Sequence, residues 1–394
     1  MPVPPLEEEG FADGIVGTTA YEAVSPQKKG FLPWHRPRKQ FVRHHQWCQQ
    51  IAALLPAIQA DGRVLKYLGL PGVDLLDLRY FHDHVCQPNQ IRLKFLGFVS
   101  GSNPLSNAQT ELNISLDEVR KLDFVDPVSE VIGDDFCLIS NDSSIAWEKT
   151  KQFGPYDVVN LDLCDGFGVH EPGVLENTHY NAVSRLLSLQ ARKKNPWLLF
   201  ITTRTGQGHV HPDVLEKFIQ KFIHNLCNCV AFQAASVDKF AIADEAALRV
   251  AVGDSRGVST VFLTGLCKWL LGLAIGHASE IEVKSVIGYR VVLEAEHEDL
   301  VSIALKFKPS FVPTPVTLGL ANHQPDPPNE CQLATQALNR VAASVDADAL
   351  LAQEGELNQA MIGETAHLLE LARYDVGEFH TWLSDLTTSS SSVA

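Results

Sequence analysis

Short β-rich runs alternate with longer helical patterns between residues 64 and 226, and this alternation restricts the fold more than any other feature of the sequence. Strands that are separated by helices are joined by crossover connections, which place them parallel in one sheet. The last run is apolar over most of its length, as a strand covered on both faces should be. The predicted strands are 64–70, 91–99, 135–140, 156–163 and 197–203, and the helical patterns lie at 73–86, 104–121, 174–193 and 211–226.

The pattern changes after residue 230. A helical region at about 240–276 precedes two β-rich runs at 282–293 and 300–308, and the short turn between these runs requires antiparallel strands. Six prolines between 309 and 328 predict an extended linker, because proline has no amide donor for a helix or sheet. The remainder, 331–386, has a helical pattern and is followed by a Ser-rich tail that is expected to be mobile.

The N-terminal region contains a basic segment. Apolar residues at helical spacing predict a helix over 39–60, and basic side chains with interleaved aromatics crowd residues 28–45. Arg36, Arg38, Lys39 and Arg43 are the candidate contacts to a nucleic-acid or protein partner. The alternative is that the segment docks against the protein's own acidic body, and the net charge of −15, which disfavours general attraction to phosphate, leaves both interpretations open.

Composition places the chain among globular proteins, with 45% hydrophobic residues. Polar residues interrupt the longest apolar stretch, 258–275, so it predicts a buried helix rather than a membrane span. Residues 1–10 lack the pattern of a secretory signal, and a cytoplasmic protein is expected. The eight cysteines are scattered through apolar runs, so free thiols are expected rather than disulfides. The C-x-C pair at 227 and 229 and the H-x-H pair at 209 and 211 lack further ligands, so no metal site is predicted.

These patterns together predict an α/β fold. It consists of a Rossmann-like, mostly parallel central sheet closed by an antiparallel strand pair, with an N-terminal arm and a helical C-terminal extension. The predicted divisions are an arm at 1–38, the sheet domain at 39–312 with a helical insertion near 235–278, a linker at 313–330 and the extension at 331–394.

The order of these elements, together with two loops, resembles the class I S-adenosylmethionine-dependent methyltransferases over residues 62–312. The first loop is Tyr67-Leu-Gly-Leu-Pro-Gly72, and the resemblance implies that Gly69 and Gly72 let the backbone approach the cofactor. The family usually has an acidic residue just before this turn, where Lys66 and Tyr67 stand here. In a second register, 73–78 is the first strand, Asp77 is the acidic residue at its end and no glycine turn follows.

The resemblance also implies roles for residues after later strands. The acid that holds the cofactor's ribose in the family is missing after the second strand, where the sequence is Phe98-Val-Ser-Gly-Ser-Asn103. Asp142 matches the position that contacts adenine, although an Asn-Asp pair is equally typical of a simple turn.

The second informative loop, 160–168, follows the fourth strand and contains Asp162 and Asp165. The carboxyl ends of parallel strands line the ligand crevice, so one of these carboxylates could take a proton from an acceptor nucleophile. The alternative is that they cap local turns.

The resemblance implies a methyltransferase that uses S-adenosylmethionine as cofactor on a nucleic-acid or protein acceptor. The missing ribose acid and the sparse glycine turn fit equally a catalytically inactive Rossmann-like module that serves as a binding or scaffolding subunit. A crevice that binds another nucleotide is a third interpretation, since fold does not fix function. The G-x-S-x-G, P-loop and H-E-x-x-H motifs of other enzyme classes are absent from the sequence. The linker and the helical C-terminus favour a homo-oligomer contact or a place in a complex.

Overall fold

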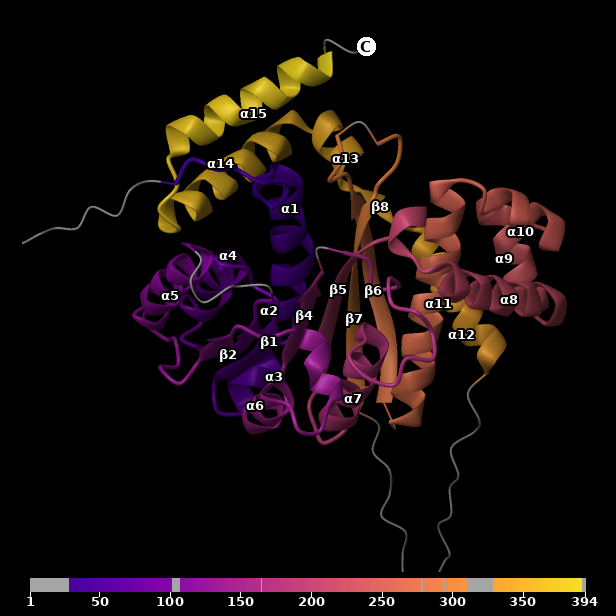
Figure 1. The fold of residues 1–394 in the computed structure, drawn as a ribbon, viewed down its shortest axis with the longest axis horizontal. Helices are drawn as coiled ribbons and strands as arrows, with labels where there is room; N and C mark the ends of the chain where they lie inside the picture. The colour runs from indigo at the N-terminus through magenta and orange to yellow at the C-terminus, as the bar shows by residue number, and fades with distance from the viewer. Residues whose placement is uncertain are drawn as a thin grey trace, which may run out of the picture.

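The computed structural model is an open eight-stranded sheet with helices packed on both faces (Figure 1). It describes residues 28–100, 107–163, 165–277, 279–293, 295–309 and 329–391. The strands are β1 (Val64–Gly69), β2 (Arg92–Phe98), β3 (Glu130–Ile132), β4 (Val158–Asp162), β5 (Trp197–Arg204), β6 (Ser279–Tyr289), β7 (Leu300–Pro309) and β8 (Val345–Asp346).

The sheet has the order β3-β2-β1-β4-β5-β7-β6-β8. Every neighbouring pair is parallel except β5–β7 and β6–β7, so the sheet is mostly parallel, as predicted. The antiparallel β6–β7 pair extends the sheet beyond β5, and the sheet ends open instead of closing. The chain passes from β1 outward to β3 and then returns to β4 beside β1, which makes the β1–β4 junction the point where the strand order reverses.

Each face of the sheet carries its own hydrophobic core, because successive strand residues point to opposite sides. In β5, Leu198 and Phe200 belong to one core, whereas Leu199 and Ile201 belong to the other. The first core is covered by helices from the two ends of the chain: α1 (Pro37–Val42), α2 (Gln49–Ala52), α3 (Leu55–Ala60), α4 (Leu76–Phe81), α5 (Asn107–Arg120), α13 (Ala347–Gln353), α14 (Gly355–Leu371) and α15 (Val376–Ser391).

The second core lies under helices from the middle of the chain. These are the 3₁₀ helix η4 (Phe136–Ser140), α6 (Ile145–Phe153), α7 (His179–Gln190), α11 (Ser255–Gly276) and α12 (Glu330–Ala342). A smaller third core joins α11 and α12 to α8 (Pro212–Asn228), α9 (Val230–Phe240) and α10 (Glu245–Ala251), which stand beside the sheet in Figure 1.

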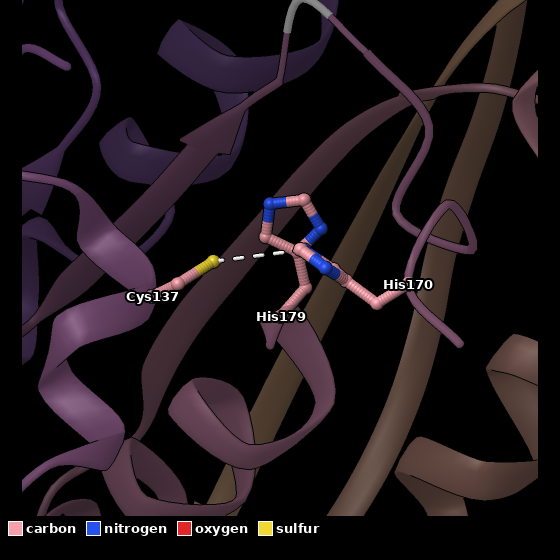
Figure 2. A group of neighbouring side chains, drawn as sticks. All are labelled: Cys137, His170 and His179. Carbon is pink, nitrogen blue, oxygen red and sulfur yellow. Dashed lines mark hydrogen bonds between the residues drawn. The ribbon is translucent and has the colours of Figure 1, made fainter. Parts of the chain in front are cut away.

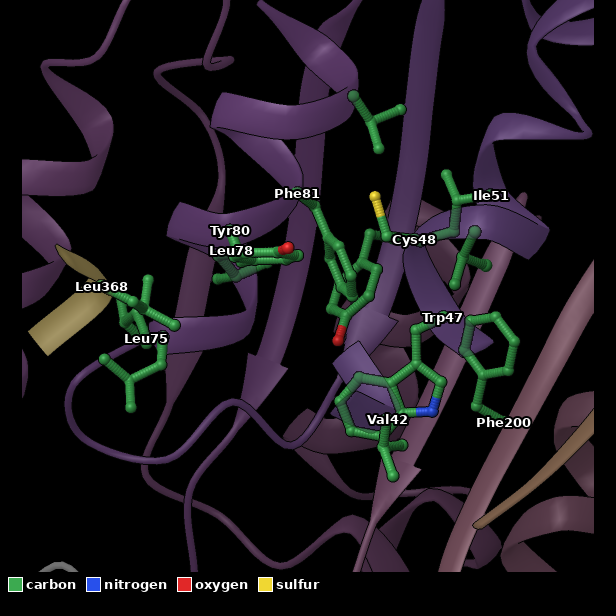
Figure 3. Packing of buried hydrophobic residues seen from close by; sticks show 14 of the residues in the cluster. Val42, Trp47, Cys48, Ile51, Leu75, Leu78, Tyr80, Phe81, Phe200 and Leu368 are labelled. Atoms are coloured by element: carbon green, nitrogen blue, oxygen red, sulfur yellow. The ribbon is translucent and has the colours of Figure 1, made fainter. Parts of the chain in front are cut away.

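The predicted N-terminal helix runs from α1 through a π-helical segment, Arg43–Cys48, into α2 and α3. Its apolar stripe packs on the first core, where the fully buried Trp47 stacks on Phe200 with ring centroids 6.1 Å apart (Figure 3). Phe81 of α4 meets the same indole edge-on. This stripe holds the N-terminal helix against the sheet, next to the carboxyl ends of β1 and β4.

Two sequence assignments for this region are resolved. The first strand is β1, Val64–Gly69, so the second register was wrong: residues 76–81 form α4 and place Asp77 in its first turn. The strand predicted at 135–140 was also wrong, because the Asp135 carboxylate caps the Cys137 amide and starts η4 there. The third strand is instead the three-residue β3, which pairs with the end of β2.

The expectation of free cysteines was wrong for one pair. Cys229 at the start of α9 is bonded to Cys331 in α12, although the two residues are 102 positions apart in sequence. Packing of α9 against α12 brings their Cα atoms within 5.4 Å, which is a normal disulfide separation. The described cysteines outside this pair, at 48, 86, 137, 227 and 267, carry free thiols.

By length and composition alone, helix α11 could cross a membrane. However, 61% of its apolar window is buried inside the protein, where it joins the second and third cores. This packing is typical of the core helix of a globular protein, as the sequence predicted. The predicted linker falls largely on residues 310–328, and with residues 1–27 and the last three residues it lies outside the described part of the chain.

Candidate functional site

The carboxyl ends of β1 and β4 form the first candidate site. In open α/β sheets, ligands bind outside the carboxyl ends of the strands at the point where the strand order reverses. Here that point lies between Gly69, the last residue of β1, and Asp162, the last residue of β4.

The Asp162 carboxylate is paired with a buried lysine from the N-terminal helix. Lys39 Nζ donates to Asp162 Oδ1 at 2.6 Å and to the Tyr289 hydroxyl at 3.3 Å. The ammonium group also lies 4.4 Å from the centroid of the Trp47 ring. Only 1% of the Lys39 side chain is exposed, so these partners take the place of water around the ammonium group.

A second ion pair lies beside the first. Arg43 Nε donates to Asp77 Oδ1 at 2.7 Å, and each side chain is 4% exposed. Burial raises the pKa of Asp77, the Arg43 guanidinium opposes that rise, and the nearby Asp162 carboxylate adds to it. Lys39, Arg43, Asp77 and Asp162 thus form a group of two cations and two anions with no net charge, which we call the edge cluster.

The predicted glycine turn is packed by the protein's own tyrosine. The Tyr67 ring folds back over Gly69, where a Cβ atom would lie 2.5 Å from the Tyr67 hydroxyl. Tyr67 is 1% exposed, and burial raises its pKa well above the ordinary value. Gly72 follows in the turn before α4 with a φ of +65°. Glycine at position 69 therefore accommodates the tyrosine ring.

The basic segment around the edge cluster contacts the protein itself. Arg36 donates to the Val291 carbonyl and Arg38 to the Arg290 carbonyl, both at 2.7 Å, and Arg38 also pairs with Asp348 at 2.9 Å. These contacts are the ones expected if the basic segment docks on the protein's own body. A partner that used the same side chains would have to displace them.

The other two predicted carboxylates have separate partners. His209 Nδ1 donates to Asp165 at 2.8 Å, and this bond, with that from the Gly166 amide, lowers the pKa of Asp165 despite partial burial. A Cβ at Gly166 would overlap the His209 carbonyl, which explains the glycine there. Asp142 lies in the exposed turn between η4 and α6, where it pairs with Arg185 of α7. The structure therefore brings Asp77 and Asp162 together but gives Asp142 and Asp165 their own partners.

A second candidate site was missed in the sequence. Cys137 on η4, His170 in the loop after β4 and His179 at the start of α7 lie side by side (Figure 2). Burial, with His170 beside it, lowers the pKa of His179 to about 4. Cys137 had been assigned to a strand, and it lies 33 residues from His170, so no spacing connected them. His170 in the loop after the fourth strand and His179, nine residues later, were the only signal.

Comparison with known proteins assigns the chain to a family and to no activity. The family model described as PP_RS20740-like matches residues 28–384. No curated protein matches the chain.

Proposed function

The chain belongs to the PP_RS20740-like family, and we propose that it is a catalytically inactive, methyltransferase-like Rossmann module that serves as a binding or scaffolding subunit. The edge cluster carries this proposal. Its four charged side chains neutralise one another at the point of the sheet where a cofactor or nucleotide would bind.

The residues at this edge do not fit S-adenosylmethionine. The Tyr67 ring fills the space above Gly69 through which a cofactor would approach the protein backbone. Lys39 engages the Asp162 carboxylate that the resemblance assigns to chemistry. The end of β2 presents the buried apolar Phe98, where the family has an acid for the ribose.

An S-adenosylmethionine-dependent methyltransferase acting on a nucleic-acid or protein acceptor is the second candidate. Two observations favour it. The order β3-β2-β1-β4-β5-β7-β6 is that of class I methyltransferases, and the loop after β4 keeps the partly exposed carboxylate of Asp165. In this function, the N-terminal helix would have to leave the edge cluster before a cofactor could enter.

Isothermal titration of the full chain with S-adenosylmethionine and S-adenosylhomocysteine distinguishes the two candidates. The inactive module gives no heat with either ligand, and mass analysis of the purified protein finds no bound nucleotide. Circular dichroism first establishes that the sample is folded. Micromolar binding, a free energy of about −8 kcal/mol, would refute the inactive module and favour the enzyme.

A binding subunit needs a partner, and we propose a homo-oligomer or a complex with another protein. We place the contact on the helical region beside the sheet, where Val230 of α9 and Val250 of α10 are 83% and 80% exposed. Light scattering coupled to size exclusion, at several protein concentrations, tests self-association. If Arg36, Arg38, Lys39 and Arg43 held a nucleic-acid partner, the complex would give a gel shift that weakens with added salt. These side chains would then have to give up their contacts within the protein.

A further inference from the structure

Three side chains with metal-ligating atoms converge on the loop between β4 and α7 (Figure 2). They are Cys137 from η4, His170 from the loop and His179 from the first turn of α7. One sulfur atom and two ring nitrogens, one from each residue, all lie within 4.8 Å of one another. We propose that these residues bind one divalent transition-metal ion, and zinc matches this ligand set best.

The spacing of the ligand atoms is close to that of a tetrahedral site. Cys137 Sγ lies 3.8 Å from His170 Nε2. With Zn–S bonds of about 2.3 Å and Zn–N bonds of about 2.0 Å, neighbouring sulfur and nitrogen ligands of a tetrahedral ion lie about 3.5 Å apart. Side-chain shifts of about 1 Å or less would therefore close the three ligands around an ion.

The ring of His179 is held as zinc ligands usually are. Its Nδ1 lies 3.4 Å from the Phe167 carbonyl oxygen, and the Phe167 ring stacks on it with centroids 5.5 Å apart. When Nδ1–H donates to this carbonyl, the lone pair of Nε2 is left for a metal. Metal-bound histidines commonly donate their second ring nitrogen to a backbone carbonyl or a carboxylate, which fixes the tautomer and the ring orientation.

Two carboxylates, those of Asp135 and Asp165, lie close enough to act electrostatically on His170 and His179. Each already has partners of its own: Asp135 accepts from the Cys137 amide at 2.8 Å, and Asp165 accepts from His209. Their negative charge favours a cation between the loops, but neither is needed as a ligand. The protein thus supplies three ligands.

The fourth coordination position would face solvent. Cys137 is 3% exposed, whereas both histidines are only partly buried, so an ion would be reached from the side of the loop. Three protein ligands leave one coordination position for an exchangeable water, whereas closed structural zinc sites use four protein ligands. The site lies at the carboxyl edge but outside the edge cluster, so it stands or falls independently of cofactor binding there.

The test uses the full chain, stripped with a chelator, reloaded with zinc and freed of excess metal. Elemental analysis gives the stoichiometry, and competition with a chromophoric chelator gives the affinity. The ligand variants are Cys137→Ser and His170→Gln, the second at a half-buried loop position. The matched controls are Cys227→Ser and His211→Gln, a free thiol and an imidazole outside the cluster.

We expect one zinc ion per chain, an affinity that falls at least about 100-fold in each ligand variant, and unchanged binding in both controls. Cobalt loading adds a thiolate-to-metal charge-transfer band that is present in the wild type and lost in Cys137→Ser. The proposal is overturned if the reloaded wild type holds no stoichiometric metal. It is also overturned if His170→Gln binds zinc as tightly as the wild type.

Discussion

Replacing Asp162 by Asn should destabilise the protein far more than the same change at Asp165, three residues later. The Asp162 change leaves the Lys39 ammonium, 1% exposed, without its anionic partner. Removing one partner of a buried ion pair typically costs about 3–5 kcal/mol, and because Asp162 is itself 21% exposed we expect about 3 kcal/mol. Asp165 is 62% exposed and its partner His209 is 35% exposed, so that change should cost less than about 1 kcal/mol.

Urea unfolding of the wild type and both variants, followed by tryptophan fluorescence and circular dichroism, measures the difference. Equal slopes with a lower midpoint for Asp162→Asn alone would show that its carboxylate is needed for folding. If Asp162→Asn unfolds at the same urea concentration as Asp165→Asn, the edge cluster is not structural. In that case the contacts that fill the crevice do not stabilise the fold.

Three further changes test other parts of the structure. Burial lowers the pKa of His35 from 6.5 to about 4, so between these pH values the unfolded chain binds a proton that the folded protein does not. The free energy of unfolding should therefore fall by about 3 kcal/mol as the pH falls from about 6.5 to 4. Urea titrations of His35→Gln should show a flatter dependence on pH. Reducing the Cys229–Cys331 disulfide should lower the free energy of unfolding by about 2–4 kcal/mol, because the bond closes a loop of 102 residues, and intact mass should rise by two hydrogens. Gly69→Ala should cost about 1–3 kcal/mol in urea unfolding, because the new methyl group overlaps the Tyr67 ring.

Each of these changes has a matched control in the chain. His380→Gln lies at an exposed position, and the pH dependence of its stability should match that of the wild type. Cys227→Ser removes a thiol that forms no disulfide and should leave the response to reductant unchanged. Gly30→Ala meets nothing within 4 Å and should be nearly neutral. If a control variant changes stability as much as the variant it is matched to, the effect of that variant does not come from the contact or burial proposed for it.

Much of the sheet could be predicted because four of its strands, β1, β2, β4 and β5, are β-rich runs that alternate with helical patterns. The third strand could not be predicted, because Glu130–Ile132 has only three residues, which pair with the end of β2, and it contains no longer apolar run. The segment Phe136–Ser140 has the apolar composition of a strand, but the Asp135 cap starts a 3₁₀ turn there. A side-chain cap at one residue therefore outweighed β-propensity over the next five.

The site was predictable only in part for a related reason. Asp162 could be placed at the carboxyl edge because it ends an apolar strand, but Lys39, its partner, is 123 residues away in the sequence. The N-terminal helix brings the two together through the packing of Trp47, which no local pattern specifies. Whether a carboxylate at a strand end faces a ligand or a buried lysine depends on such long-range packing.

The energy of the edge cluster limits what can bind beside it. Admitting a ligand at the carboxyl ends of β1 and β4 would separate Lys39 from Asp162 and Arg43 from Asp77, at about 3–5 kcal/mol for each buried pair. Micromolar binding supplies about 8 kcal/mol, so a ligand that left those charges unpaired would lose nearly all of its binding energy. A ligand that does bind there must replace the lost partners with charges of its own. The cluster of Cys137, His170 and His179 has no such obstacle, because an ion would enter from solvent and leave the edge cluster intact.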